Sequence, residues 1–419
     1  MKANPDTEIL SVGTELLLGN VTNTDARDIS EMLSAIGINV KYHTVVGDNP
    51  SRLTECVNIA KDRADIIITT GGLGPTCDDL TKQTLASAFS LELKVNEEEL
   101  AVIDKKYRDS GHPTENVRQE AMLPENCTVF HNPCGTAPGC AFEAEGKLII
   151  MLPGPPKECR AMFSECAVPF LKKYTGSVIV SHTVNIFGMS ENEIDAALRK
   201  DMDSMTNPTM APYAKECDCL VRLTAKAATG EEAEEMLKPA VRRVTDMAGD
   251  FVYGMDVETM EQALMELLKA HPMTFSAAES CTGGELAKRF TDLPGASEFF
   301  MGGAVTYTNN AKSVILGIPP ELIEKYGAVS RPVAEEMAKR VRALLNTDVG
   351  IGITGLAGPD GDGVNPVGTV FVSLADRDSV YVRKLYIKSA IRTRTYIRHM
   401  AENNAFDMLR RYITALPVA

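Results

Sequence analysis

The short aliphatic run Asp65–Thr70 (DIIITT) constrains the fold of this chain more than any other feature. Its consecutive isoleucines, Ile66–Ile68, indicate a strand that is buried on both faces, which is typical of a parallel sheet covered by helices on two sides. Strand patterns at Thr7–Val12 and Val40–Val46 precede it, and helical patterns at Thr24–Ile36 and Pro50–Arg63 separate the three. Strands that alternate with helices of this length indicate βαβ units, so we expect an α/β fold with a mostly parallel sheet.

The alternation continues to the C-terminus, with a change of character in the middle of the chain. Further strands are predicted at Lys147–Leu152, Val178–Phe187, Val221–Ala228, Thr274–Ala278, Gly303–Thr308, Val349–Thr354 and Gly368–Leu374. Helices are predicted at Asp79–Phe89, Glu191–Met202, Glu231–Met247, Cys281–Thr291, Pro332–Leu345 and from about Thr393. At ~100–200 residues per domain, the 419 residues of the chain allow two to four domains. We predict a layered α/β/α domain over residues 1–173, a small α+β insert over 174–255 and a second α/β/α domain over 256–419.

The charge of the chain argues against two classes of partner. The formal net charge is −14, and residues 1–255 carry −13 of it. Proteins that act mainly on nucleic acid or on anionic membranes are usually basic, so we expect neither as a partner.

The ten cysteines lack a disulfide-framework spacing, no segment approaches the ~20 apolar residues of a membrane span, and the first residues show no signal-peptide pattern. We expect a cytoplasmic protein with reduced thiols.

A glycine-rich loop, TGGLGPTCDD, follows the aliphatic strand. Gly71, Gly72 and Gly74 allow backbone amides to approach an anion closely, and a helix predicted to begin near Asp78 directs its positive end to the same point. The loop is neither a Walker A motif nor GxGxxG. These features favour a site for a phosphate group.

Two carboxylates in this loop, Asp78 and Asp79, would repel a phosphate unless a cation lies between them. Oxygen ligation of Mg²⁺ or a similar ion that bridges phosphates resolves the conflict. The alternative for this loop by itself is a tight turn in which one aspartate caps a helix. The loops at 13–20 and 47–49 follow neighbouring strands, however, and three loops at adjacent strand ends favour a ligand site.

A second candidate site begins at Ser280, where the strand at Thr274–Ala278 ends in AESCTGG. The amides of Thr282, Gly283 and Gly284 could stabilise an oxyanion there. A nucleophilic Ser needs a base, and neither His271 nor His399 has a loop context that suggests catalysis.

A Lys with a lowered pKa is the alternative base. Lys312 lies at the start of a helix after the strand that carries Tyr307, and parallel neighbouring strands would bring both residues near Ser280. Each residue taken separately also fits an ordinary role. Ser280 could be a helix cap, Tyr307 a packed strand aromatic and Lys312 a solvated helix residue.

Two more segments favour a ligand site in the same domain. The loop ITGLAGPDG, which includes Thr354 and Gly355, is another glycine-rich strand end suited to ligand approach. Arg392, Arg394 and Arg398 lie at the start of the last helix, an end that disfavours cations. A bound phosphate would offset that cost through charge-assisted bonds, and a solvent-facing basic helix is the alternative.

The strings VGTELLLGNVTNTDA, TTGGLGPTCDDLT and LPGPPKE resemble the molybdopterin-binding-type domain of the CinA (competence/damage-inducible) family. The resemblance implies a fold shared with molybdenum-cofactor biosynthesis proteins. It also implies a metal-dependent pyrophosphatase that splits ADP-ribose into AMP and ribose 5-phosphate, with Mg²⁺, Mn²⁺ or Co²⁺ as the metal. Asp78 and Asp79 would be metal ligands or water activators, with Glu15 and Asp48 as further metal ligands. The residues that would cradle phosphate are Gly71, Gly72, Gly74 and Thr76.

The strings AESCTGG, GGAVTYTNNAK and ITGLAGPDG resemble the C-terminal domain of the same family, the nicotinamide mononucleotide deamidase. The resemblance implies hydrolysis of nicotinamide mononucleotide to nicotinate mononucleotide and ammonia without a cofactor. Ser280 would be the nucleophile, Lys312 the general base and Tyr307 an aid to proton transfer or positioning. Thr354 would hold the substrate and Arg394 would contact its phosphate. The stretch SAIRT replaces the Gly-Asp-Arg common in the family, so Arg392 remains the alternative to Arg394.

The middle segment resembles the KH-like insert between the two CinA domains. RNA-binding KH domains clamp the RNA backbone with a GxxG loop, but residues 176–255 contain no GxxG and carry 8 basic against 13 acidic residues. We expect a spacer or a dimerisation element, and the family implies a homodimer. The leading hypothesis is a bifunctional hydrolase that recycles pyridine nucleotides in NAD metabolism. The alternatives are a non-catalytic scaffold or cofactor-binding protein, and molybdopterin-type nucleotide binding by the first domain.

Overall fold

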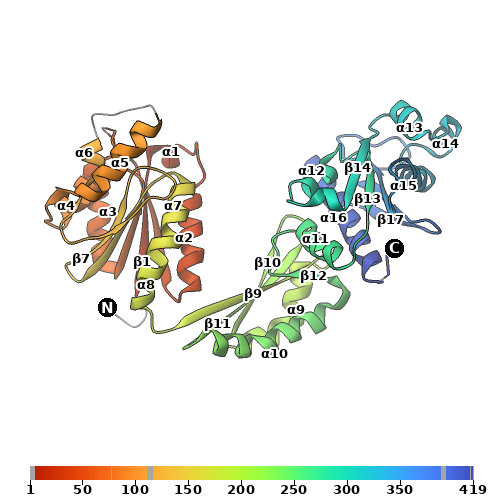
Figure 1. The fold of residues 1–419 in the computed structure, drawn as a ribbon. Helices are drawn as coiled ribbons and strands as arrows, with labels where there is room; N and C mark the ends of the chain where they lie inside the picture. The colour runs from red at the N-terminus through yellow and green to blue at the C-terminus, as the bar shows by residue number, and fades with distance from the viewer. Residues whose placement is uncertain (1–4, 77, 111–116, 388–392, 416, 419) are drawn as a thin grey trace. The chain divides into compact units, whose positions relative to one another are not determined.

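The computed structural model describes residues 5–76, 78–110, 117–387, 393–415 and 417–418. The chain divides into two compact units, Met1–Ser181 with Thr224–Met236, and His182–Leu223 with Leu237–Ala419. Each unit contains one layered α/β sheet (Figure 1). Within the described residues, no helix has both the length and the hydrophobicity needed to cross a bilayer.

The sheet of the first unit has the strand order β2-β1-β3-β8-β7-β6. Its strands are β1 (Asp6–Val12), β2 (Asn39–Val46), β3 (Ile66–Thr70), β6 (Thr128–Phe130), β7 (Gly139–Ala144) and β8 (Lys147–Leu152). The strands β1, β2, β3 and β8 are parallel, and β7 and β6 extend one edge in antiparallel pairing. The predicted α/β fold with a mostly parallel sheet is therefore confirmed.

Helices cover both faces of this sheet because its strands are apolar on both faces. Ile9 in β1 packs into the cluster under α2 (Thr24–Ala35) and α7 (Pro156–Met162), while its neighbour Leu10 packs into the cluster under α3 (Pro50–Arg63). The remaining elements of the unit are α1 (Thr14–Leu17), α4 (Thr81–Ala88), β4 (Leu93–Val95), α5 (Glu97–Ser110), α6 (Val117–Glu120), β5 (Met122–Pro124), a π-helical turn (Phe163–Ala167), α8 (Val168–Leu171) and a 3₁₀ turn (Lys172–Tyr174).

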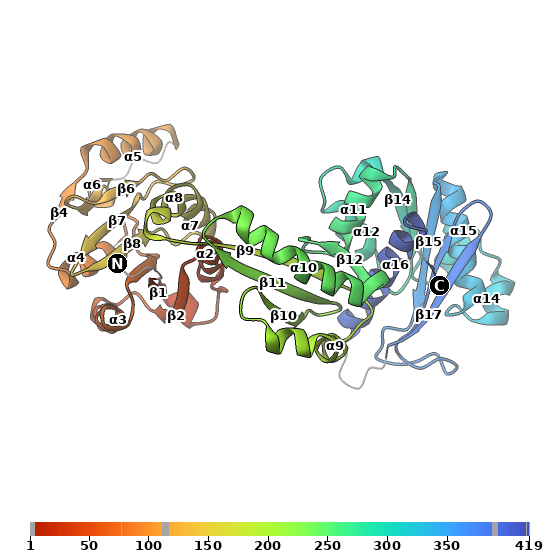
Figure 2. The ribbon, with the colours of Figure 1, turned by 90° about the horizontal axis from the view of Figure 1, so that it is seen from below.

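A small α+β segment follows, with the strand order β10-β11-β9-β12. Its elements are β9 (Val178–Ile186), α9 (Glu191–Ser204), β10 (Thr209–Ala214), β11 (Cys219–Ala227), α10 (Gly230–Ala248), a 3₁₀ turn (Gly249–Phe251) and β12 (Val252–Met255). Both helices lie on one face of the strands (Figure 2).

The sheet of the second unit has the strand order β14-β13-β15-β16-β17. Its strands are β13 (Phe275–Glu279), β14 (Phe300–Val305), β15 (Val349–Gly355), β16 (Thr369–Ala375) and β17 (Val380–Tyr386). Its helices are α11 (Met260–Ala270), α12 (Glu285–Thr291), α13 (Asn309–Leu316), α14 (Pro320–Tyr326), α15 (Arg331–Leu345) and α16 (Arg394–Ile413), with a 3₁₀ turn at Ala296–Glu298. β14, β13 and β15 are parallel, whereas β16 and β17 are antiparallel. One core lies under α11, α12 and α16, and another lies between the opposite face and α13, α14 and α15.

Three predicted boundaries near the candidate sites are wrong. The helix α4 begins at Thr81 because Asp78 and Asp79 accept hydrogen bonds from Thr76 in a turn. The helix α12 begins at Glu285 because the glycines at 283 and 284 have φ of +67° and +96°. The strand β14 ends at Val305, since Thr308 is the N-cap of α13.

Candidate active sites

A cavity of about 560 Å³ lies at the carboxyl ends of the parallel strands in the first unit. The end of β1, the loop after β3 and the Pro-Gly-Pro-Pro loop after β8 line it. Doubly wound sheets bind ligands at this edge, and cavities of ~300–1,000 Å³ accommodate ligands of nucleotide size. The predicted convergence of strand-end loops is therefore present.

The glycines of the loop after β3 are required by close packing. A Cβ atom on Gly71 would lie 2.2 Å from the Val12 carbonyl oxygen, and one on Gly72 would lie 2.2 Å from Thr81 Oγ1. Both residues have positive φ, +94° and +67°. At Gly74 a Cβ would lie 2.7 Å from Asp79 Oδ2. The glycines thus allow the loop to pack closely against its neighbours while it lines the cavity.

Thr76 binds the two aspartates that follow it. Its amide donates to Asp79 Oδ2 at 2.9 Å, and its hydroxyl contacts the carboxylates of Asp78 and Asp79. The Thr76 hydroxyl keeps the pKa of Asp78 below its ordinary value. The helix predicted to begin near Asp78 begins at Thr81 instead, and the hydrogen bonds from Thr76 stabilise the two carboxylates that precede it.

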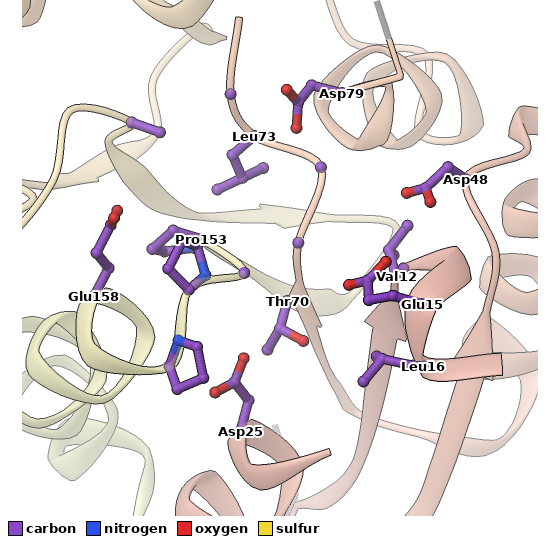
Figure 3. A pocket seen from close by; sticks show the side chains of 18 of the residues that line it. Val12, Glu15, Leu16, Asp25, Asp48, Thr70, Leu73, Asp79, Pro153 and Glu158 are labelled. Atoms are coloured by element: carbon purple, nitrogen blue, oxygen red, sulfur yellow. The ribbon is translucent and has the colours of Figure 1, made fainter. Parts of the chain in front are cut away.

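The other two predicted metal ligands, Glu15 and Asp48, lie across the glycine loop from Glu158 (Figure 3). Asp48 Oδ2 accepts hydrogen bonds of 2.8 Å from both the amide and the hydroxyl of Thr14. Among the described residues, no three of the predicted metal-ligand carboxylates bring their ligand atoms within 4.8 Å of one another. The arrangement does not form a closed protein cage, but it fits a hard cation held by one or two carboxylates together with a substrate's phosphates.

The cavity contains acidic residues that the sequence analysis did not assign. Asp25 and Glu158 lie on its other side (Figure 3), and burial, assisted by the charge of Asp28, raises the pKa of Asp25 to about 6. Glu120 also lines the cavity. The position of Glu158 just after the end of β8, at the same sheet edge, was the signal that could have identified it.

In the second unit, three parallel strands end side by side. In the sheet register Glu279 of β13 lies opposite Val305 of β14 and Ile353 of β15. The Ser280 amide donates to the Ile353 carbonyl at 2.9 Å, and the Thr306 amide donates to the Glu279 carbonyl at 2.7 Å. These bonds continue the ladder past the strand ends and fix the backbone around Ser280.

Ser280 and Lys312 are in direct contact. Lys312 Nζ lies 2.9 Å from Ser280 Oγ and 2.8 Å from the Thr306 carbonyl oxygen. Lys312 is 1% exposed and Ser280 is 7% exposed. Burial lowers the pKa of Lys312 to about 8, against a smaller opposing effect of Cys281. The structure thus places a buried amine with a lowered pKa on a serine hydroxyl.

The turn after Ser280 is anchored by Glu279, a residue that the sequence analysis quoted without a role. Its carboxylate accepts hydrogen bonds from the amides of Gly284, Leu286 and Ala287 at 2.9, 3.1 and 2.9 Å. A carboxylate at the N-terminus of a helix binds orphan amides and opposes the helix dipole. An acid shortly before a Gly-Gly pair that precedes a helix was the signal for this anchor.

The oxyanion prediction needs a correction. The Gly284 amide is bound to Glu279, and the Gly283 amide donates to the Ser280 carbonyl, so neither is available as an oxyanion donor. Within the described residues, no other residue accepts a hydrogen bond from the amides of Cys281 and Thr282. The Thr282 hydroxyl is buried and has no partner there either.

The remaining predicted residues of this site form contacts with residues other than Ser280 and Lys312. Tyr307 is 56% exposed, and its hydroxyl accepts a 2.7 Å hydrogen bond from Arg394, which also donates to the Gly358 carbonyl. The Thr354 hydroxyl is buried and donates to the Ala328 carbonyl at 2.8 Å, so its proton is already used within the fold. Gly355 packs against β16, where a Cβ would lie 2.9 Å from a backbone oxygen.

The third arginine of the C-terminal cluster is bound to the turn after Ser280, since Arg398 donates to the Thr282 carbonyl at 2.6 Å and pairs with Glu285 at 2.7 Å. Arg392, the alternative phosphate ligand, lies outside the described residues.

Comparisons with known proteins cover nearly the whole chain. Residues 8–173 match the model described as "Probable molybdopterin binding domain", residues 181–254 the "Damage-inducible protein CinA KH domain" and residues 257–413 the "CinA C-terminal domain". A protein named as competence-damage inducible from Thermoanaerobacter pseudethanolicus is 44% identical over 98% of this chain and 99% of its own length.

A CinA-like protein from Desulfovibrio desulfuricans is 45% identical over 98% of this chain and 97% of its own length. A crystal structure of CinA from Thermoplasma acidophilum is 33% identical and covers 41% of this chain and 98% of that chain, with a TM-score of 0.37.

Proposed function

The chain belongs to the CinA family of competence/damage-inducible proteins, and from this premise we propose that its second unit is an amidase acting on nicotinamide mononucleotide. The reaction would convert the nicotinamide carboxamide to a carboxylate and release ammonia. The products would be nicotinate mononucleotide and ammonia.

The contact between Lys312 Nζ and Ser280 Oγ, at 2.9 Å, carries this proposal. A serine hydroxyl is a weak nucleophile until a base removes its proton, and a desolvated lysine with a lowered pKa is such a base. No described histidine forms a hydrogen bond with Ser280 or Lys312. A buried Ser–Lys pair at the point where three parallel strands end is a more specific indication of nucleophilic catalysis than either residue alone.

The chemistry would proceed by acyl transfer. Ser280 Oγ attacks the carboxamide carbon while Lys312 takes the hydroxyl proton. Collapse of the tetrahedral intermediate breaks the C–N bond, and Lys312 returns that proton to the departing nitrogen, which leaves as ammonia. A water molecule then attacks the ester carbon, again with Lys312 as base, and releases the carboxylate and free Ser280. The amides of Cys281 and Thr282 are the donors that we assign to the oxyanion.

Arg394 is the described residue that supports binding of the substrate's phosphate. It lies at the N-terminus of α16, and its guanidinium reaches Tyr307 beyond the end of β14. Tyr307 is accordingly assigned to substrate positioning, because its hydroxyl contacts Arg394. A phosphate at this point would be favoured by both the arginine and the helix N-terminus.

The first unit supports a second proposed activity, a metal-dependent ADP-ribose pyrophosphatase. The observation in its favour is the 560 Å³ cavity, where the Gly71–Gly74 backbone is surrounded by carboxylates. Asp78, Asp79, Glu15 and Asp48 are the residues that would hold Mg²⁺, Mn²⁺ or Co²⁺. Such an ion supplies charge neutralisation of the phosphates and activation of water. Molybdopterin-type nucleotide binding at the same cavity remains the second hypothesis, and AMP formation from ADP-ribose distinguishes the two.

Substitution of the dyad tests the amidase directly. Ser280→Ala and Lys312→Ala should each reduce ammonia release from nicotinamide mononucleotide by at least about 10³-fold, because the nucleophile or its base is lost. Lys312→Arg should be equally inactive, since a guanidinium stays protonated. Ser313→Ala and Lys325→Ala change residues of the same types on α13 and α14 and should keep full activity. Near-normal ammonia release by Ser280→Ala or Lys312→Ala would rule out the dyad.

A further inference from the structure

A separate group of ionisable side chains lies in the second unit, where Glu285, His399 and Glu402 meet. Their ligand atoms lie within 4.8 Å of one another, and the described residues contain no other group of three or more His, Cys, Asp or Glu residues that does so. His399 and Glu402 are three residues apart on α16 and share one face of it. The amidase chemistry proposed above uses none of the three.

His399 is held between two carboxylates. Its Nδ1 lies 3.1 Å from Glu216 Oε2, and its Nε2 lies 3.2 Å from Glu285 Oε1. Metal-binding histidines typically bond their second ring nitrogen to a carboxylate, which fixes the tautomer and the ring orientation. The distance between Nε2 and Oε1 also matches the ~3.3 Å that separates two ligands with bonds of ~2.0–2.1 Å at a tetrahedral angle.

Each of the two glutamates in the group has one oxygen engaged by an arginine. Glu402 Oε2 accepts a 3.0 Å hydrogen bond from Arg289, and Glu285 Oε2 lies 2.7 Å from an Arg398 nitrogen. Glu402 is fully buried, and within the described residues its Oε1 has no hydrogen-bond partner. A buried carboxylate oxygen without a partner is costly. A cation in the group would supply the missing interaction.

Carboxylates outnumber guanidinium groups in the ion pairs around this group. Among the described residues, these ion pairs join the four carboxylates of Glu216, Glu261, Glu285 and Glu402 with the guanidinium groups of Arg289 and Arg398 and with the His399 imidazole. Beside His399 lies a cavity of about 320 Å³, which Glu216, Cys217, Glu261 and Arg289 also line. The cavity provides a route by which an ion could reach the imidazole.

We infer that Glu285, His399 and Glu402 form a binding site for a divalent transition metal ion of the Zn²⁺ class, with Glu216 orienting the imidazole. Zn²⁺ binds both imidazole nitrogens and carboxylate oxygens, and three such ligands leave a fourth position for water. Mg²⁺ and Ca²⁺ prefer oxygen-only ligand sets, so the imidazole disfavours them.

Zn²⁺ titration of the full-length protein tests the site. Protein stripped of metal with a chelator is titrated by calorimetry, and bound Zn²⁺ is counted by elemental mass spectrometry. Cysteines and the carboxylates of the first unit can bind Zn²⁺ as well, so the decisive quantity is the difference between variants. His399→Gln and Glu402→Gln each remove one ligand. His182→Gln is the matched control, because that histidine pairs with Asp256 in the same unit.

Wild-type protein and His182→Gln should bind one Zn²⁺ equivalent more than His399→Gln or Glu402→Gln, and a hundredfold excess of Mg²⁺ should not displace it. Glu216→Gln should keep this equivalent with about 10- to 100-fold weaker affinity. Equal stoichiometry and affinity in wild type and both ligand variants, each folded by circular dichroism, would overturn the inference. If those variants do not fold, wild-type crystals grown with Zn²⁺ decide it. An anomalous peak among the three side chains supports the site, and its absence refutes it.

Discussion

Lys312 combines two properties that a general base requires, contact with the nucleophile and a pKa near the working pH. The contact follows from position, because Lys312 lies in the first turn of α13, directly after a strand parallel to the one that ends at Ser280. The lowered pKa follows from burial. This proximity could be predicted from strand order and spacing, whereas the use of the Gly283 and Gly284 amides by other groups could not.

The pKa of Lys312, lowered to about 8, predicts a defined pH dependence for the proposed amidase activity. The base acts in its neutral form, which increases as pH rises through the pKa. Between pH 7 and pH 9, kcat/KM for nicotinamide mononucleotide should therefore rise about tenfold, with a midpoint near pH 8. Steady-state ammonia assays across this range provide the measurement. A kcat/KM that falls or stays constant over the range would exclude Lys312 as the base of the free enzyme.

At the scale of elements, the strands and helices that build the two sheets could largely be predicted. The apolar runs of β3 and β8 and the amphipathic helices α2 and α3 show their periods clearly in the sequence. The strands β4 and β5 could not be predicted, because strands of three residues are too short to show a period of two. The helix α5 was missed although Leu100, Ile103 and Tyr107 follow a helical spacing. The edge strand β17 (VYVRKLY) was missed as well, although five of its seven residues are Val, Leu or Tyr.

The helix α12 depends on Glu279, whose carboxylate accepts three backbone amides at its N-terminus. In Glu279→Gln one acceptor oxygen becomes an NH₂ group that faces an N–H. We expect a loss of about 1–3 kcal/mol in the free energy of unfolding and a lower kcat for ammonia release. Thermal unfolding and steady-state assays measure both. The exposed Glu298→Gln is the control, which should remain within about 0.5 kcal/mol of wild type. Wild-type stability of Glu279→Gln would contradict the anchoring role.

The loop after β3 depends on Gly71, because an added Cβ would meet the Val12 carbonyl oxygen at 2.2 Å and φ is +94°. Gly71→Ala should destabilise the first unit by about 2–5 kcal/mol and abolish AMP formation from ADP-ribose. Gly146→Ala is the matched control, since Gly146 also has positive φ, +73°, but no atom within 4 Å of an added Cβ. It should cost only about 1 kcal/mol. A Gly71→Ala variant no less stable than Gly146→Ala would show that the loop can relax.

At the scale of the whole molecule, the two candidate sites belong to different compact units. The excess acidity lies mainly in residues 1–255, where carboxylates surround a cavity suited to phosphates and a cation. The second candidate site instead pairs a buried serine and lysine with an arginine at a helix N-terminus. This division could be predicted from motifs and charge distribution. The group of Glu285, His399 and Glu402 could not, because its members come from elements more than a hundred residues apart.

The most direct measurement is a paired assay of wild type and Ser280→Ala with nicotinamide mononucleotide and ADP-ribose, each with and without EDTA. We predict that wild type releases ammonia whether or not EDTA is present, and forms AMP only without it. Ser280→Ala should release no ammonia while forming AMP at the wild-type rate. Ammonia release that persists in Ser280→Ala, or its absence from wild type between pH 7 and pH 9, would contradict the assignment of Ser280 and Lys312 as an amidase dyad.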